Sequence, residues 1–177
     1  MSTEPWQRAE TAGPQRAHVM TKPEVAVAII KRSKRPIIVA GHDVCDNEAK
    51  PLEYVIQLAK ARTMPVVATA HTGKAFLENG YEPASMMGAM DIANRLKDES
   101  WKGLDGKGPY DTVLILGLPY FMEWLILSGL KSFARKLTTI SLDRYYQPHA
   151  SWSFPNSSEK AWGENLSVIV KGLGGNI

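Results

Sequence analysis

Four polar side chains that could carry out chemistry lie close together just after the first apolar run of the chain: His42, Asp43, Cys45 and Asp46. Histidine, cysteine and aspartate are metal ligands, and a cysteine near a histidine pairs a nucleophile with a base. Neither chemistry follows from spacing alone, because proximity in a loop establishes no coordination geometry. Asp46 and Asn47 also suit the N-cap of a following helix. We therefore expect no metal ligand and no catalytic residue in this chain.

Three glycines at positions 103, 106 and 108 form a second conspicuous pattern. Glycine-rich loops cradle phosphates when they follow a strand and open a helix. Here the glycines precede the apolar run at 112–116, and the sequence contains neither a Walker A motif nor a G-x-S-x-G elbow. We interpret the loop as a connection at the amino end of a strand, with Trp101, Lys102 and Tyr110 exposed as contacts for a partner.

The composition is that of a soluble globular protein. The chain has 177 residues, is 44% hydrophobic and carries a net charge of +3, which favours one domain and gives no indication of a nucleic-acid partner. The basic run at 31–35 is explained by the dipole at the end of a helix. One cysteine excludes an internal disulfide, or an iron–sulfur cluster held by this chain alone. With no secretory h-region and no continuous apolar span, we expect a cytoplasmic protein without a membrane span.

Apolar strands alternate with helices from Thr21 onward, after a segment at 1–20 that reads as a flexible or partner-draped arm. We expect strands at 36–41, 65–69, 112–116 and 137–142, an extended piece at 152–154, and helices at 21–30, 47–62, 73–77, 84–97, 120–135 and 158–172. Met86 and Met90 fall on an apolar stripe typical of a core-facing helix. The order predicts a single Rossmann-like domain over 21–177, an α/β fold with a doubly wound, mostly parallel sheet.

In such a sheet, ligands bind beyond the carboxyl ends of the strands, where the strand order reverses. Glycines there would let a nucleotide approach the backbone, and neighbouring side chains would supply polar and stacking contacts. The alternative is that the glycines only permit sharp turns between strand and helix. The candidate cofactor-binding residues are Gly41, His42, His71, Thr72, Gly117, Leu118, Tyr120 and Asp143.

The expected helix from Tyr120 is apolar nearly all round. A helix that covers one face of a sheet needs only one apolar stripe, and the excess aromatic side chains, Phe121 and Trp124, suit a protein–protein interface. The alternative is a helix wedged between the sheet and a neighbouring helix. Both interpretations remain open at the level of the sequence.

Three segments carry a resemblance to a known family: RPIIVAG at 35–41, MPVVATAHT at 64–72, and the run WKGLDGKG-x-YDTV that starts at Trp101. From about residue 20 to its end, the chain resembles the epsilon subunits of archaeal acetyl-CoA decarbonylase/synthase. The resemblance implies a three-layer α/β/α fold like the FAD/NAD-binding (DHS-like) domain of thiamine-diphosphate enzymes. It also implies a partner, the carbon monoxide dehydrogenase alpha subunit, in an α2ε2 component of a larger complex. The nickel–iron and iron–sulfur clusters would belong to alpha.

Two functions follow as hypotheses. The first, implied by the resemblance, is a non-catalytic accessory subunit that stabilises alpha or assists electron transfer to FAD, in a complex that reversibly makes or cleaves acetyl-CoA in methanogens and related archaea. The second is a free-standing flavin- or nicotinamide-dependent oxidoreductase. The missing phosphate fingerprint and the lack of a convincing acid–base pair count against the second. We expect the first, with FAD as the cofactor to test for.

Overall fold

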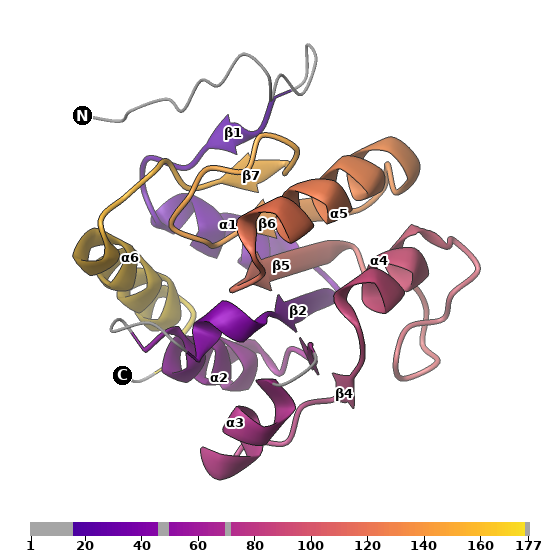
Figure 1. Cartoon of the computed structure of the whole chain (residues 1–177), viewed down its shortest axis with the longest axis horizontal. Helices are drawn as coiled ribbons and strands as arrows, with labels where there is room; N and C mark the ends of the chain where they lie inside the picture. Colours follow the sequence, from indigo (N-terminus) through magenta and orange to yellow (C-terminus); the bar gives the residue numbers. More distant parts are fainter. Residues whose placement is uncertain (1–15, 46–49, 70–71, 176–177) are drawn as a thin grey trace.

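The computed structural model describes residues 16–45, 50–69 and 72–175. Within these residues, seven parallel strands form one sheet in the order β1-β7-β6-β5-β2-β3-β4 (Figure 1). The chain passes from β2 to β3 and β4 on one side and then returns to β5 on the other, so the strand order reverses between β2 and β5. The strands are β1 (His18–Val19), β2 (Pro36–Ala40), β3 (Val66–Ala68), β4 (Ser85–Met86), β5 (Thr112–Leu116), β6 (Thr138–Ser141) and β7 (Trp152–Ser153).

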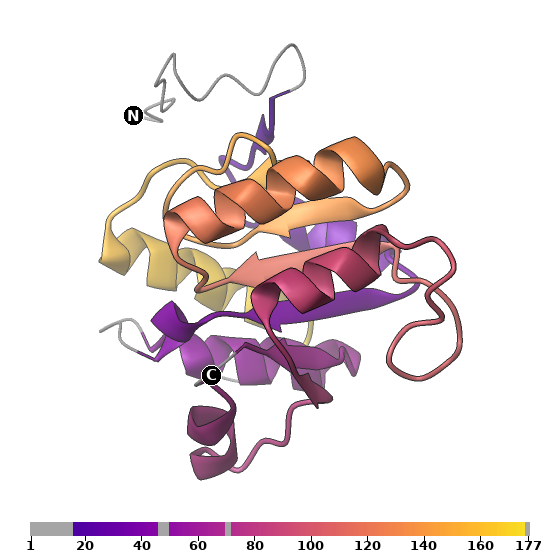
Figure 2. The ribbon, with the colours of Figure 1, turned by 45° about the vertical axis from the view of Figure 1, so that its right-hand side comes forward.

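Helices cover both faces of the sheet and make three layers (Figure 2). One face is covered by α4 (Ala89–Lys97) and α5 (Tyr120–Phe133), and the other by α1 (Glu24–Arg32), α2 (Pro51–Arg62) and α6 (Glu159–Gly172). Two short elements, η2 (His42–Val44) and α3 (Thr72–Glu78), follow β2 and β3 along the chain. No helix in the described part of the chain has the length and apolarity needed to cross a membrane.

The uninterrupted apolar sequence of β5 is explained by burial on both faces. All five residues of the strand are buried. Leu114 and Leu116 pack into the core beneath α1, α2 and α6, whereas Val113 and Ile115 pack into the core beneath α4 and α5. Because successive side chains of a strand point to opposite faces, one apolar run serves both cores.

The predicted α/β fold with a doubly wound, mostly parallel sheet is confirmed. The helix predicted over 84–97 is wrong at its start, because Ser85 and Met86 form the edge strand β4 and α4 begins at Ala89. Pairing with β3 and the bond from Met87 N to Ala68 O override the helical periodicity there. Met86 and Met90 are 62% and 44% exposed, so the predicted core-facing stripe is wrong for these two, whereas Ala93 and Leu96, the other members of the stripe, pack in the core.

The folded domain starts before the predicted boundary at residue 21. His18 and Val19 pair with β7 at the sheet edge, and Met20 is buried. The Tyr146 hydroxyl donates to the carbonyl of Ala17 at 3.0 Å. Residues 17–20 therefore belong to the domain, while residues 1–15 of the predicted arm lie outside the described residues. The first part of the helix predicted over 47–62 also lies outside them, and α2 begins at Pro51.

Candidate functional site

At the point where the strand order reverses, the backbones of the loops after β2 and β5 are in direct contact. Gly41, after β2, donates its N–H to Leu116 O at 2.8 Å, and Asp43 N–H donates to Gly117 O at 2.9 Å. A Cβ on Gly41 would lie 2.0 Å from Gly117 O, and Gly117 has a φ of +79°. The two glycines are thus explained by the close approach of the two loops, and no room for a phosphate is left between them.

Beside these loops, a carboxyl pair ties α5 to the end of β6. Asp143 accepts one bifurcated hydrogen bond from Gly117 N–H, with its two oxygens at 2.9 and 3.1 Å, and is hydrogen-bonded to the Glu123 carboxyl. Gln147 Nε2 donates to Glu123 Oε2 at 3.2 Å and to Tyr120 O at 3.1 Å. Glu123 is fully buried, on a helix turn whose other residues are apolar or aromatic.

Both carboxyl groups of the pair have a pKa above the usual range. Burial, reinforced by the charge of Asp143, raises the pKa of Glu123 well above its usual range. Burial also raises the pKa of Asp143, to about 6, although the hydrogen bonds from Glu123 and Gly117 oppose that rise. Hydrogen bonds from Ser141 and Gln147 to the Glu123 carboxyl oppose the rise in its pKa. We assign Glu123 as the acid that donates to the Asp143 carboxylate.

A cavity of 310 Å³ opens beside the pair, at the lower end of the range for small-molecule sites. Its wall combines acceptors with apolar and aromatic surface. Its one arginine, Arg144, is already engaged by Glu159 at 3.5 Å and by the ring of Tyr145. The cavity therefore favours a neutral or hydrogen-bond-donating group over a phosphate. The lining residues are Asp43, Leu118, Tyr120, Glu123, Asp143, Arg144, Tyr145, Gln147 and Trp162.

The structure brings together five of the eight residues predicted to bind a cofactor. Leu118, Tyr120 and Asp143 line the cavity, Gly117 is hydrogen-bonded to Asp143, and Gly41 lies against Gly117. The other three do not join them.

His42 is exposed and does not line the cavity. Thr72 is buried at the start of α3, where its hydroxyl donates to Thr69 O. His71 lies outside the described residues. Among residues 16–45, 50–69 and 72–175, no group of three or more metal-ligating side chains is assembled.

Sequence reasoning missed Glu123, Gln147 and Trp162. A signal for Glu123 was present, because it is the only charged residue between 112 and 130. A lone carboxylate in an apolar helix must either face solvent or find a buried partner. Gln147 and Trp162 carried no such signal, because only the fold brings α6 and the segment after β6 to the cavity.

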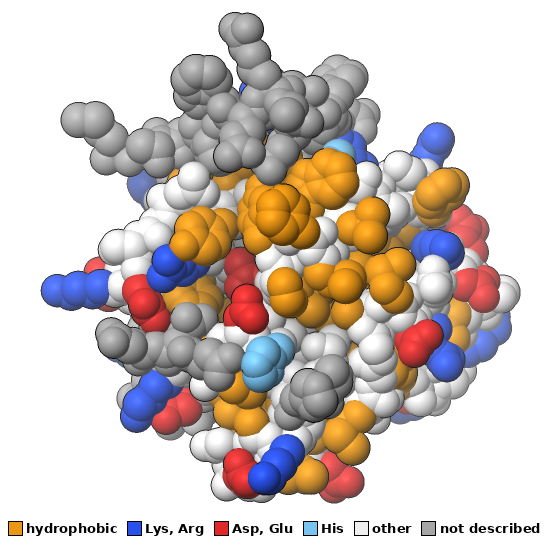
Figure 3. Space-filling view, in the orientation of Figure 1, with side chains coloured by type: hydrophobic (Ala, Val, Ile, Leu, Met, Phe, Trp, Pro, Cys, Tyr) orange, Lys and Arg blue, Asp and Glu red, His pale blue; other side chains and the backbone are white. Residues whose placement is uncertain are grey.

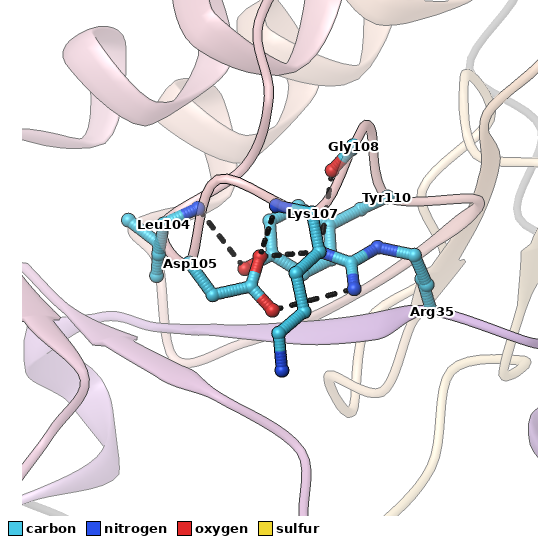
Figure 4. A network of polar contacts seen from close by, with 6 residues as sticks. All are labelled: Arg35, Leu104, Asp105, Lys107, Gly108 and Tyr110. Atoms are coloured by element: carbon cyan, nitrogen blue, oxygen red, sulfur yellow. Dashed lines mark hydrogen bonds and ion pairs between the residues drawn. The ribbon is translucent and has the colours of Figure 1, made fainter.

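The glycine-rich loop before β5 is fastened to the body of the protein by Arg35 (Figure 4). The Arg35 guanidinium donates to Asp105 Oδ1 at 2.6 Å and to Gly108 O at 3.2 Å, and it lies 5.1 Å from the centre of the Tyr110 ring. The hydrogen bond from Arg35 lowers the pKa of Asp105 to about 2. Lys31 and Arg32 lie in the last turn of α1, as the dipole interpretation requires, whereas Arg35 acts in the loop.

This fastening corrects part of the predicted docking loop. Tyr110 is only 8% exposed, and its hydroxyl accepts a hydrogen bond from Leu104 N–H inside the loop. Trp101 is half-buried and packs near Tyr110, with ring centres 5.6 Å apart. Lys102 is exposed, as expected. The prediction that all three are exposed is therefore wrong for Tyr110 and only partly right for Trp101.

Helix α5 presents an apolar surface, which we call the α5 face and define as Phe121, Met122 and Leu125. Their exposed fractions are 79%, 39% and 54%. Hydrophobic side chains gather over this part of the molecule in Figure 3. Trp124 differs from them, because it is half-buried with its ring against His149, 4.7 Å between centres. One side of the helix thus packs on the sheet and another side is uncovered by the described residues, and the predicted protein–protein interface stays a prediction.

Comparison with known proteins agrees with the resemblance in the sequence. The family described as CO dehydrogenase beta subunit/acetyl-CoA synthase epsilon subunit matches residues 1–170. The chain belongs to this family. It is 37% identical over 165 residues to the acetyl-CoA decarbonylase/synthase complex subunit epsilon of Methanothermobacter thermautotrophicus, covering 93% of each chain.

Two further epsilon subunits show similar agreement. Subunit epsilon 1 of Archaeoglobus fulgidus is 43% identical over 137 residues, covering 76% of this chain and 72% of the relative. The epsilon subunit of Methanothrix soehngenii is 38% identical over 153 residues, covering 86% of this chain and 80% of the relative. The predicted membership of the epsilon family is confirmed.

Proposed function

We propose that this epsilon-family chain is a non-catalytic accessory subunit that docks on the carbon monoxide dehydrogenase alpha subunit and stabilises it, as an α2ε2 component of acetyl-CoA decarbonylase/synthase. The names of its relatives support membership of that complex. The observation that carries the docking is the α5 face, where Phe121 is 79% and Leu125 is 54% exposed.

The energetics favour this face as a contact. Phe121 and Leu125 are four residues apart and therefore neighbours on the helix surface. Fully burying a side chain of this size contributes about 1.5–3 kcal/mol. Two adjacent apolar side chains at the centre of an interface are therefore enough to form a binding hot spot. A subunit held in this way stabilises its partner by mass action, because it binds only the folded form.

The test is co-purification of the chain with tagged alpha, using the double variant Phe121→Asp and Leu125→Asp. We expect binding to be lost, because two carboxylates would enter an apolar contact. Val168→Asp is the matched control, since Val168 is 38% exposed on α6, which packs on the opposite face of the sheet. Trp124 is unsuitable for this test, because a charge there would disturb its packing on His149.

Both variants should have the melting temperature of the wild type. This control would show that they fold. Binding retained by the double variant would show that alpha docks elsewhere. The stabilising role is tested separately, by the half-life of carbon monoxide oxidation by alpha at raised temperature with and without this chain. An unchanged half-life would contradict that role.

We also propose that FAD binds here with only part of the molecule inside the cavity. One ring or the ribityl segment would enter it, and the phosphates would stay outside. The 310 Å³ volume admits one ring system, and Leu118, Tyr120 and Trp162 supply apolar and aromatic walls. The carboxylates of Asp43 and Asp143 would repel a phosphate there. Quenching of flavin fluorescence tests this. Riboflavin and FAD should bind equally, and Tyr145→Ala should weaken both. If FAD bound and riboflavin did not, the proposal that the phosphates lie outside the cavity would be wrong.

A further inference from the structure

We propose that docking on the α5 face is proton-linked: the partner binds while Glu123 holds its proton, and it is released when that proton leaves. This inference rests on the docking proposed above. Glu123 lies between Met122 and Trp124 in the sequence, yet its side chain is fully buried on the opposite side of the helix from the α5 face. A single turn therefore carries both the contact surface and a buried acid.

The same hydrogen-bond network holds the start of the helix in place. Gln147 Nε2 bonds to Tyr120 O and to Glu123 Oε2, at 3.1 and 3.2 Å. Asp143 bonds to Glu123 and holds Gly117 N–H, just before the helix begins. The position of Phe121 and Leu125 therefore depends on contacts that include the Glu123 carboxyl.

With its proton, Glu123 donates to the Asp143 carboxylate. Without it, two carboxylates face each other in a buried space. The charged and titratable groups that face the pair do not relieve this. Asp43, from η2, adds a third negative charge and raises the pKa of Asp143. Tyr120 and Tyr145 line the same cavity and bring no positive charge to the pair, and Arg144 is engaged by Glu159 of α6 at 3.5 Å.

We infer that the repulsion is relieved by a shift of the first turn of α5. Asp143 follows β6, a strand paired on both sides, by β5 and by β7. The first turn of α5 instead bears exposed side chains on its outer side. Burial raises the pKa of both acids, so proton loss occurs above the range usual for a carboxyl. Docking is thus expected to weaken as the pH rises.

The experiment measures the dissociation constant of fluorescently labelled chain and alpha, from pH 6 to pH 9, for the wild type, Glu123→Gln and Glu164→Gln. Glutamine keeps a donor toward Asp143 and cannot ionise. For the wild type, the dissociation constant should rise by up to about tenfold per pH unit once the proton leaves. For Glu123→Gln it should change less than about twofold over the same range. Glu164 is exposed on α6, so Glu164→Gln should follow the wild type.

The outcomes separate the two proposals. No binding by the wild type at any pH would refute the docking itself. Binding with the same pH profile in the wild type and Glu123→Gln would refute the proton link and leave the docking intact. A second measurement needs no variant: the amide resonances of Gly117 and Phe121 followed by NMR in the wild-type chain. They should shift with one midpoint, and a Phe121 resonance that stays unmoved while Gly117 titrates would overturn the proposal.

Discussion

Arg35 and Asp105 meet at 2.6 Å although 70 residues separate them in the sequence. Arg35 immediately precedes β2, and Asp105 lies in the glycine-rich loop that leads to β5. Because β2 and β5 are neighbours in the sheet, the start of one strand lies beside the loop that leads to the other. The ion pair thus holds that loop in one shape.

Replacing Arg35 by Gln should loosen the loop without unfolding the protein. The amides of Leu104 and Gly108 should exchange hydrogen faster, because the guanidinium no longer organises Asp105, Gly108 O and the Tyr110 ring. The pair is partly exposed, so the melting temperature should fall by less than about 3 °C. Lys34→Gln is the control, since Lys34 is the exposed neighbouring cation. Equal exchange in both variants would show that Arg35 does not hold the loop.

Replacing Gly117 by Ala should be severely destabilising. A Cβ there would lie 2.3 Å from Val44 Cγ1 and 2.7 Å from Val44 N, at a φ of +79°. Backbone strain and overpacking together should lower the free energy of unfolding by roughly 2–6 kcal/mol. Gly106→Ala is the matched control, because Gly106 has a similar φ of +72° and nothing within 4 Å of its Cβ position.

The free energy of unfolding of Gly106→Ala should fall by only about 1–2 kcal/mol, because this variant has the unfavourable positive φ but no steric clash. Urea denaturation of both variants measures the difference. Similar losses in the two would mean that the contact with Val44 is easily relieved.

Replacing Glu123 by Gln should flatten the dependence of stability on pH. The pKa of Glu123 is raised in the folded state, so its contribution to stability is fully present below the unfolded value of about 4.3 and is lost as the pH rises toward the folded pKa. The free energy of unfolding of the variant, relative to the wild type, should therefore increase by up to about 1.4 kcal/mol per pH unit.

Urea midpoints measured from pH 5 to pH 9 test this prediction. Glu164→Gln again serves as the exposed control and should parallel the wild type. A wild-type curve with the same pH dependence as Glu123→Gln would mean that Glu123 is ionised in the folded protein over that range.

The alternation of apolar runs and amphipathic segments was enough to predict the sheet and most helices. Its error at 84–97 has a physical cause: hydrophobic periodicity does not distinguish a strand of two residues, Ser85 and Met86, from the first turn of a helix. Five of the proposed ligand residues meet at the carboxyl edge because the parallel topology requires it. Thr72 does not join them, because it follows β3, on the other side of β2 from β5.

The amino-acid sequence by itself determined the α/β class and the family, whereas the strand order that places the switch point at Gly41 and Gly117 came from the structure. Apolar periodicity carries the fold class, and the resemblance of three segments, at 35–41, 64–72 and from Trp101, carries the family. Only the tertiary structure decided that Arg35 holds the loop, that Glu123 is buried against Asp143, and that Phe121 stays exposed while Trp124 is half-buried. Each of these depends on which distant segment packs against a side chain. Burial and partner charge, which set exposure and pKa, exist only once the layers are assembled.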